Sequence, residues 1–108
     1  IMSKYTFKTA KYNVQVGVDR PLRQVFASIF VNGKAEKAAK NFDPFTWFDV
    51  SDNGVTEAVE AVTQYIRKND NKNFEMPKEL VDMLKQDVQT NLRNPLLSLN
   101  QCKCFGDV

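Results

Sequence analysis

The sequence predicts a small α+β protein, in which an antiparallel sheet of about three strands in the N-terminal half is packed by two or three helices in the C-terminal half. Two observations carry this prediction. Between residues 4 and 18, apolar residues alternate with polar ones, which is the period of a strand. From residue 55 onward they recur every three or four positions, which is the period of an amphipathic helix.

Three strands are expected. Residues 5–7 and 12–18 each alternate, and the turn at residues 19–22 leads into a third strand at residues 23–31. The run from 25 to 31 is apolar on both faces, so both faces need cover. If Val25, Ala27 and Ile29 point towards the helices, Phe26 and Phe30 lie on the second face. Either residues 45–48 or another subunit could cover that face, as in a homodimer.

The middle of the chain is less regular. Asn32-Gly33 precedes alanines at helical spacing, which favours a short helix over residues 35–42, although Asn-Gly could also form a hairpin turn. Pro44 ends this segment. The aromatic stretch at residues 45–50 suits either a short strand or an irregular segment that plugs the core.

Two longer helices follow, near residues 55–68 and 77–93, with Pro77 in the first turn of the second. We expect residues 1–108 to form a single domain, with Met2 as the native start and residues 100–108 frayed. The expected core comprises Val25, Ile29, Val59, Val62, Leu80, Leu84 and Val88.

Composition restricts the environment and the chemistry. No apolar run is long enough to span a membrane. The chain has no histidine, and its two cysteines, Cys102 and Cys104, are too few for a disulfide scaffold, so we expect reduced thiols and no metal site. These features predict a cytoplasmic, reducing location.

An enzyme is not expected. The commonest general base, histidine, is missing, and the four glycines are isolated, so no phosphate-binding loop is present. Carboxylate pairs at helical spacing, such as Glu57 and Glu60, are typical of a solvated helix face. No cofactor is implied.

Residues 49–60 resemble the calcium-binding loop of EF-hand proteins. The matching positions are Asp49, Ser51, Asn53, Gly54 and Glu60. The resemblance implies a single calcium site. The other reading of these residues is a capped turn that starts the next helix.

The first alternative to a protein partner is binding of single-stranded nucleic acid, and the calcium site is the second alternative. Tyr5, Phe7 and Tyr12 interleave with lysines, and stacking rings beside cations can hold single strands. Residues 1–40 carry eight Lys or Arg against two acids, whereas residues 41–66 carry five acids and no base. This split predicts a basic side and an acidic side.

The preferred interpretation is a non-enzymatic protein that acts by protein–protein contact, such as an inhibitor or adaptor encoded by a phage or mobile element. The expected partner-binding residues are basic and lie in the N-terminal part of the chain: Lys8, Lys11, Arg20, Arg23 and Lys34. Phe26 and Phe30 are the residues expected to mediate self-association.

Overall fold

A computed structural model describes residues 2–19, 24–33, 37–42, 46–49, 52–93 and 101–108. Its elements are, in chain order, β1 (Met2–Lys8), β2 (Tyr12–Asp19), β3 (Gln24–Val31), β4 (Thr46–Asp49), α1 (Asp52–Asn69), α2 (Lys78–Arg93) and β5 (Gln101–Asp107). The α+β class is therefore correct.

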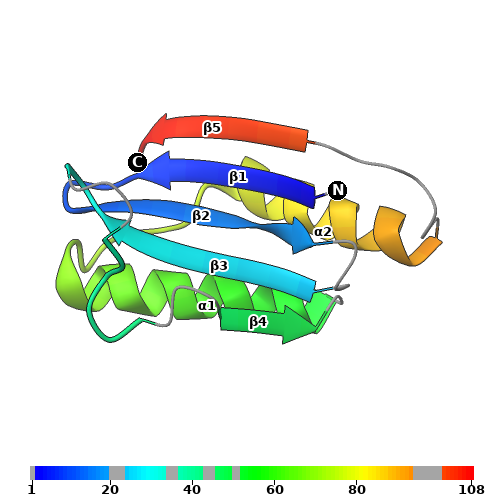
Figure 1. The fold of residues 1–108 in the computed structure, drawn as a ribbon, viewed down its shortest axis with the longest axis horizontal. Coiled ribbons are helices and arrows are strands. Elements are labelled where there is room, and N and C mark those ends of the chain that lie inside the picture. The colour runs from blue at the N-terminus through cyan, green and yellow to red at the C-terminus, as the bar shows by residue number, and fades with distance from the viewer. Residues whose placement is uncertain (1, 20–23, 34–36, 43–45, 50–51, 94–100) are drawn as a thin grey trace.

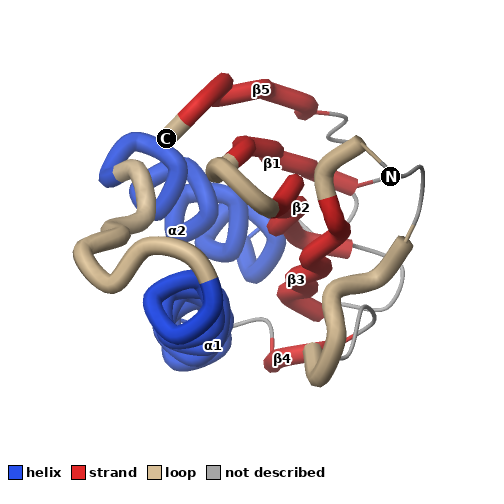
Figure 2. Tube along the Cα trace, turned by 90° about the vertical axis from the view of Figure 1, so that its left-hand side faces the viewer, coloured by secondary structure: helices blue, strands red, loops and turns tan. Residues whose placement is uncertain are grey.

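The strands form one sheet in the order β4-β3-β2-β1-β5 (Figure 1). All neighbours are antiparallel except β1 and β5, which run parallel. The predicted number of strands, about three, is too low, because β4 and β5 extend the predicted sheet at its two edges. Seen along the strands, both helices lie against the same side of the sheet (Figure 2).

The pairing of β1, β2 and β3 determines which residues face the helices. Tyr5 lies opposite Val16, and Val16 lies opposite Ala27 on the next strand. Side chains alternate between the two faces of a strand, so every second residue of each strand joins the same layer. The residues of this layer are all buried: Ser3, Tyr5, Phe7, Val14, Val16, Val18, Val25, Ala27 and Ile29.

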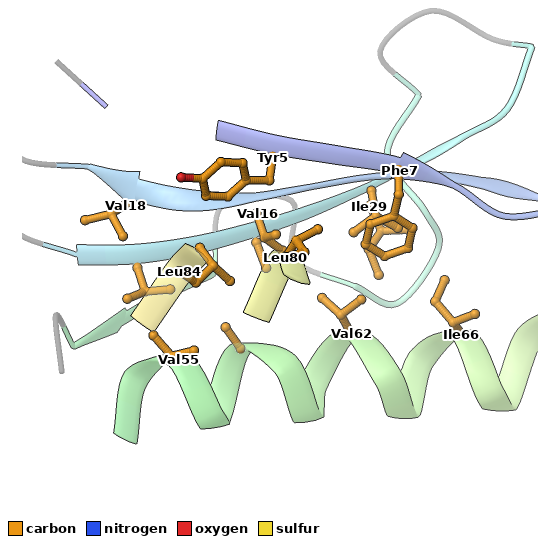
Figure 3. Close-up of a cluster of buried hydrophobic side chains, with 14 of the residues drawn as sticks. Tyr5, Phe7, Val16, Val18, Ile29, Val55, Val62, Ile66, Leu80 and Leu84 are labelled. Carbon is orange, nitrogen blue, oxygen red and sulfur yellow. The ribbon is translucent and has the colours of Figure 1, made fainter. Parts of the chain in front are cut away.

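The helices complete the core from the other side (Figure 3). The residues that they bury fully are Val55, Ala58, Val62 and Ile66 on α1 and Leu80, Leu84 and Val88 on α2. The predicted core is confirmed except that Val59 is only partly buried against it. Phe74, between the helices, also joins the core and stacks on Phe7 with ring centroids 5.6 Å apart.

Residues 37–42 do not form the predicted helix; residues 34–36 lie outside the described part. Gly33 has a φ of 77°, which reverses the chain. The returning segment then pairs with the end of β3, where the Val31 N–H donates to the Lys37 carbonyl oxygen at 2.8 Å and Phe30 forms a bridge with Ala38. The described residues 37–42 therefore pair with β3 instead of continuing the helical spacing of the alanines.

Two further segments pair at the edges of the sheet. Residues 46–49 form β4 beside β3, in the plane of the sheet, so of the two predicted alternatives this stretch is the short strand. Where the sequence predicts a frayed tail, residues 101–107 form β5. Its Phe105 ring contacts Tyr5 at a centroid distance of 6.3 Å, and its Lys103 ammonium binds Glu79 of α2 at 2.6 Å.

Neither helix in the described ranges combines the length and apolarity that crossing a bilayer requires.

Candidate functional site: the open sheet face

The sheet face opposite the helices is not covered by either helix (Figure 2). We call it the open face. Its described residues on β1, β2 and β3 are Lys4, Thr6, Lys8, Asn13, Gln15, Gly17, Asp19, Gln24, Phe26, Ser28 and Phe30. On β5 the residues in register with Lys4, Thr6 and Lys8 are Cys102, Cys104 and Asp107. Most of these side chains are partly or fully exposed.

Two phenylalanines on β3 give the open face an apolar patch. Phe26 and Phe30 are each half-buried and lie on β3. The Phe26 ring lies over Gly17, since a Cβ built on that glycine would be 2.9 Å from two ring carbons. An aromatic ring over a strand glycine protects backbone that would otherwise be bare. Phe30 lies beside the returning segment through its bridge with Ala38.

The described part of the open face is nearly balanced in charge. Lys4 and Lys8 are basic, whereas Asp19 and Asp107 are acidic. The remaining polar groups are uncharged amides, hydroxyls and thiols. A phosphate-binding surface requires an excess of Lys and Arg, because affinity for nucleic acid comes largely from neutralising phosphates. This face lacks such an excess in its described residues.

The two cysteines lie at the β5 rim of the open face, and both are free and exposed. The pKa of the Cys104 thiol is lowered from its ordinary value, first by a hydrogen bond from the Gly106 backbone and then by one from the Thr6 side chain. Desolvation and the charge of Asp107 oppose this shift, and the charge of Lys8 adds to it. A thiol in such surroundings has more thiolate character than an ordinary surface cysteine.

The structure separates the basic residues that the sequence grouped together. Lys8 lies on the open face. Lys11, in contrast, lies in the turn after β1, where its ammonium donates to the Asn69 carbonyl oxygen and its backbone N–H to the Asp70 carboxylate, both at 3.0 Å. Lys11 therefore holds the C-terminal end of α1. The other three predicted residues, Arg20, Arg23 and Lys34, lie outside the described residues.

The rings expected to stack on nucleic acid are not available on the open face. Tyr5 and Phe7 are 0% exposed and point towards the helices. Tyr12 packs edge-on against Tyr65 of α1, with centroids 5.5 Å apart. Tyr65 in turn donates from its hydroxyl to the Lys40 carbonyl oxygen at 2.5 Å. Burial, followed by a hydrogen bond with Tyr12, raises the pKa of Tyr65 to about 12. The contact between the two rings joins β2 to α1.

A buried polar contact links β1 to α2. The Tyr5 hydroxyl donates to the carboxylate of Asp87, a side chain only 7% exposed. Burial raises the pKa of Asp87, and the hydrogen bonds from Tyr5 and Ser3 oppose that rise. Burial also raises the pKa of Tyr5. This contact lies beneath the sheet, so its role is to fix α2 against β1. The signal in the sequence was an acid, Asp87, next to the apolar stripe of α2.

The EF-hand resemblance is not supported by the backbone. Such a loop presents its ligands from an irregular twelve-residue segment. Here α1 begins at Asp52, so Asn53 and Gly54, which would have to lie in the irregular part of the loop, are helical. Among the described residues, no group of three or more His, Cys, Asp or Glu side chains could hold a metal ion.

Comparison with protein-family models, with curated proteins and with solved structures finds no match to this chain.

Proposed function

We propose that this chain is a non-enzymatic binding protein that docks on another protein through the open face. One observation carries the proposal: both helices cover the same face of the sheet, and the other face presents two half-buried rings, Phe26 and Phe30, among mainly uncharged polar groups. Protein interfaces are enriched in aromatic residues and depleted of charge at their centres.

The same observation favours protein over nucleic acid as the partner. The face is nearly neutral where it is described, and Tyr5 and Phe7 are buried on the opposite side. Among the described residues, a nucleic-acid partner would find Phe26 and Phe30 for stacking and only Lys4 and Lys8 as cations on this face. A protein partner needs an apolar pocket for the rings and polar groups around it. The proposal includes a role as an inhibitor or adaptor that is encoded by a phage or mobile element. It also places the protein in a reducing cytoplasm.

The decisive experiment compares surface variants in capture of a partner from the host proteome. Gln15→Arg and Lys4→Glu change half-buried side chains of the open face, whereas Lys72→Glu and Lys85→Glu change exposed side chains on the helical side. We expect the open-face variants to lose a partner that the wild type and the helical-side variants retain. Loss with the helical-side variants alone would contradict the proposal.

A parallel titration tests nucleic acid. Fluorescence anisotropy with a single-stranded oligonucleotide at physiological salt should show weak, sequence-blind binding. Submicromolar affinity that falls steeply with salt would show that the partner is nucleic acid and not protein, provided that it is lost in Phe26→Ser and Phe30→Ser variants that remain folded.

A further inference from the structure

The pairing of β5 with β1 brings both thiols of the chain to one face. Cys102 is in register with Lys4, and Cys104 is in register with Thr6. Lys103, between them, points to the opposite side, because its ammonium reaches Glu79 of α2. The two cysteines therefore lie side by side on the open face, one full strand repeat apart, and both are exposed.

This spacing does not suit a disulfide. Residues two apart on a strand have Cα atoms about 6.6 Å apart, and their parallel side chains keep the Cβ atoms at a similar separation. A disulfide requires a Cβ–Cβ distance of about 3.5–4.5 Å. A metal ion bonded to both sulfurs allows the two side chains to stay farther apart than a disulfide does. With metal–thiolate bonds of about 2.3 Å, a linear arrangement places the sulfurs about 4.6 Å apart. Each sulfur then needs to lie only about 1 Å closer to the other than its Cβ does, and this is the scale of a side-chain rotation about the Cα–Cβ bond.

We propose that Cys102 and Cys104 form a two-thiolate site for a soft monovalent metal cation, namely Cu(I). Soft thiolates select Cu(I) over hard cations. Structural zinc requires four ligands, and the described residues offer no third candidate beside the thiols. On binding, each thiol releases its proton to solvent and forms one sulfur–copper bond, with no change in oxidation state.

The surroundings fit the charge of the product. Two thiolates and one monovalent cation leave a net charge of −1. Lys4 is the register partner of Cys102 and supplies a positive charge beside it, whereas Lys8 is offset by its own register partner, Asp107. Opposite charge beside a metal–thiolate group stabilises it. This site lies at the rim of the open face and is independent of the protein partner proposed above.

The test is an anaerobic competition for Cu(I) supplied as its coloured bicinchoninate complex, with the protein fully reduced. We expect the wild type to remove one equivalent of copper per chain and to remain a monomer at the dilute concentration used. Cys102→Ser and Cys104→Ser should each weaken binding by more than the roughly 10–100-fold that loss of an outer-shell partner costs.

A matched control keeps two thiols but separates them. The double variant Cys102→Ser/Lys103→Cys places its thiols at adjacent positions of β5, which point to opposite faces. We expect it to bind as weakly as the single-serine variants, with an unchanged far-ultraviolet circular dichroism spectrum. Wild-type affinity in this variant, no removal of copper by the wild type, or copper bound only between two chains would each overturn the two-thiolate site.

Discussion

Gly17 lies in β2 at a point where the neighbouring strands leave no room for a side chain. A Cβ at this position would be 1.9 Å from the main-chain oxygen of Ser3 and 2.9 Å from the Phe26 ring. The nearest obstacle is backbone, which cannot rotate away. The ring of Phe26 and the absence of a side chain at Gly17 are therefore complementary, and both shape the open face.

We expect Gly17→Ala to lower the free energy of unfolding by at least about 1–3 kcal/mol, as overpacking does in a filled site. Urea denaturation measures this loss. Gln15→Ala, on the same face of the same strand, should change stability by no more than about 0.5 kcal/mol. Equal stability of the two variants would show that Gly17 is not constrained as described.

Asp87 predicts a specific dependence of stability on pH. Its pKa in the folded state is raised above the ordinary value of 3.8. Below 3.8 the carboxyl is neutral whether the chain is folded or unfolded. Between 3.8 and the folded-state pKa, the unfolded chain loses this proton while the folded protein keeps it, so the free energy of unfolding falls as the pH rises. Above the folded-state pKa the buried carboxyl is ionised, and the stability that its neutral form contributed is lost. Asp87→Asn keeps an oxygen that accepts from Tyr5 but cannot ionise.

We therefore expect the stability of Asp87→Asn, relative to the wild type, to increase as the pH rises from about 3.8 through the folded-state pKa. Urea denaturation at a series of pH values gives the difference directly, and effects of the other carboxylates cancel in it. A difference that is constant with pH, or that decreases, would refute the raised pKa. Tyr5→Phe, which removes the donor, should destabilise the protein by about 1–3 kcal/mol near neutral pH.

The elements that the sequence predicts well are those with a long, local repeat. Alternation identified β2, and the apolar stripes identified α1 and α2, because each pattern extends over several turns or residue pairs. β5 was missed because Gln101–Asp107 contains lysine, glycine and aspartate, and its strand state depends on parallel pairing with β1, nearly the whole chain away. A non-local contact of this kind leaves little trace in local composition.

The candidate site was predictable only in part. Alternation placed Phe26 and Phe30 opposite Val25, Ala27 and Ile29, and the structure keeps them there. The sequence shows only the charge of Lys11 and so predicts a partner-binding residue. Its contacts with Asn69 and Asp70 depend on where α1 ends, which the local sequence around Lys11 does not reveal. The thiols joined the open face only through the register of β5.

The layer between sheet and helices provides a test at the level of elements. Ile29 is 0% exposed and lies on β3, which packs against α1. We expect Ile29→Ala to lower the free energy of unfolding by about 2–5 kcal/mol, because it leaves a cavity. Gln24→Ala, on the opposite face of β3, is the control and should have little effect. A loss below about 1 kcal/mol at Ile29 would contradict the packing of β3 in this layer.

For the whole molecule, the open face also predicts weak self-association. Phe26 and Phe30 are only half-buried, and a two-fold dimer would cover them by repeating one patch. We expect sedimentation at tens of micromolar to give a mass above the 12.4 kDa of one chain, and Phe30→Ser to reduce it. A monomer of that mass at these concentrations would exclude self-association through the rings.

The central claim is that the open face, and not the helical side, meets the partner. Lysine acetylation of the free and partner-bound protein tests this directly, since Lys4 and Lys8 lie on the open face and Lys72 and Lys85 are exposed on the helical side. We predict that the partner slows modification of Lys4 and Lys8 and leaves Lys72 and Lys85 unchanged. Protection of Lys72 and Lys85, with Lys4 and Lys8 still reactive, would contradict the claim.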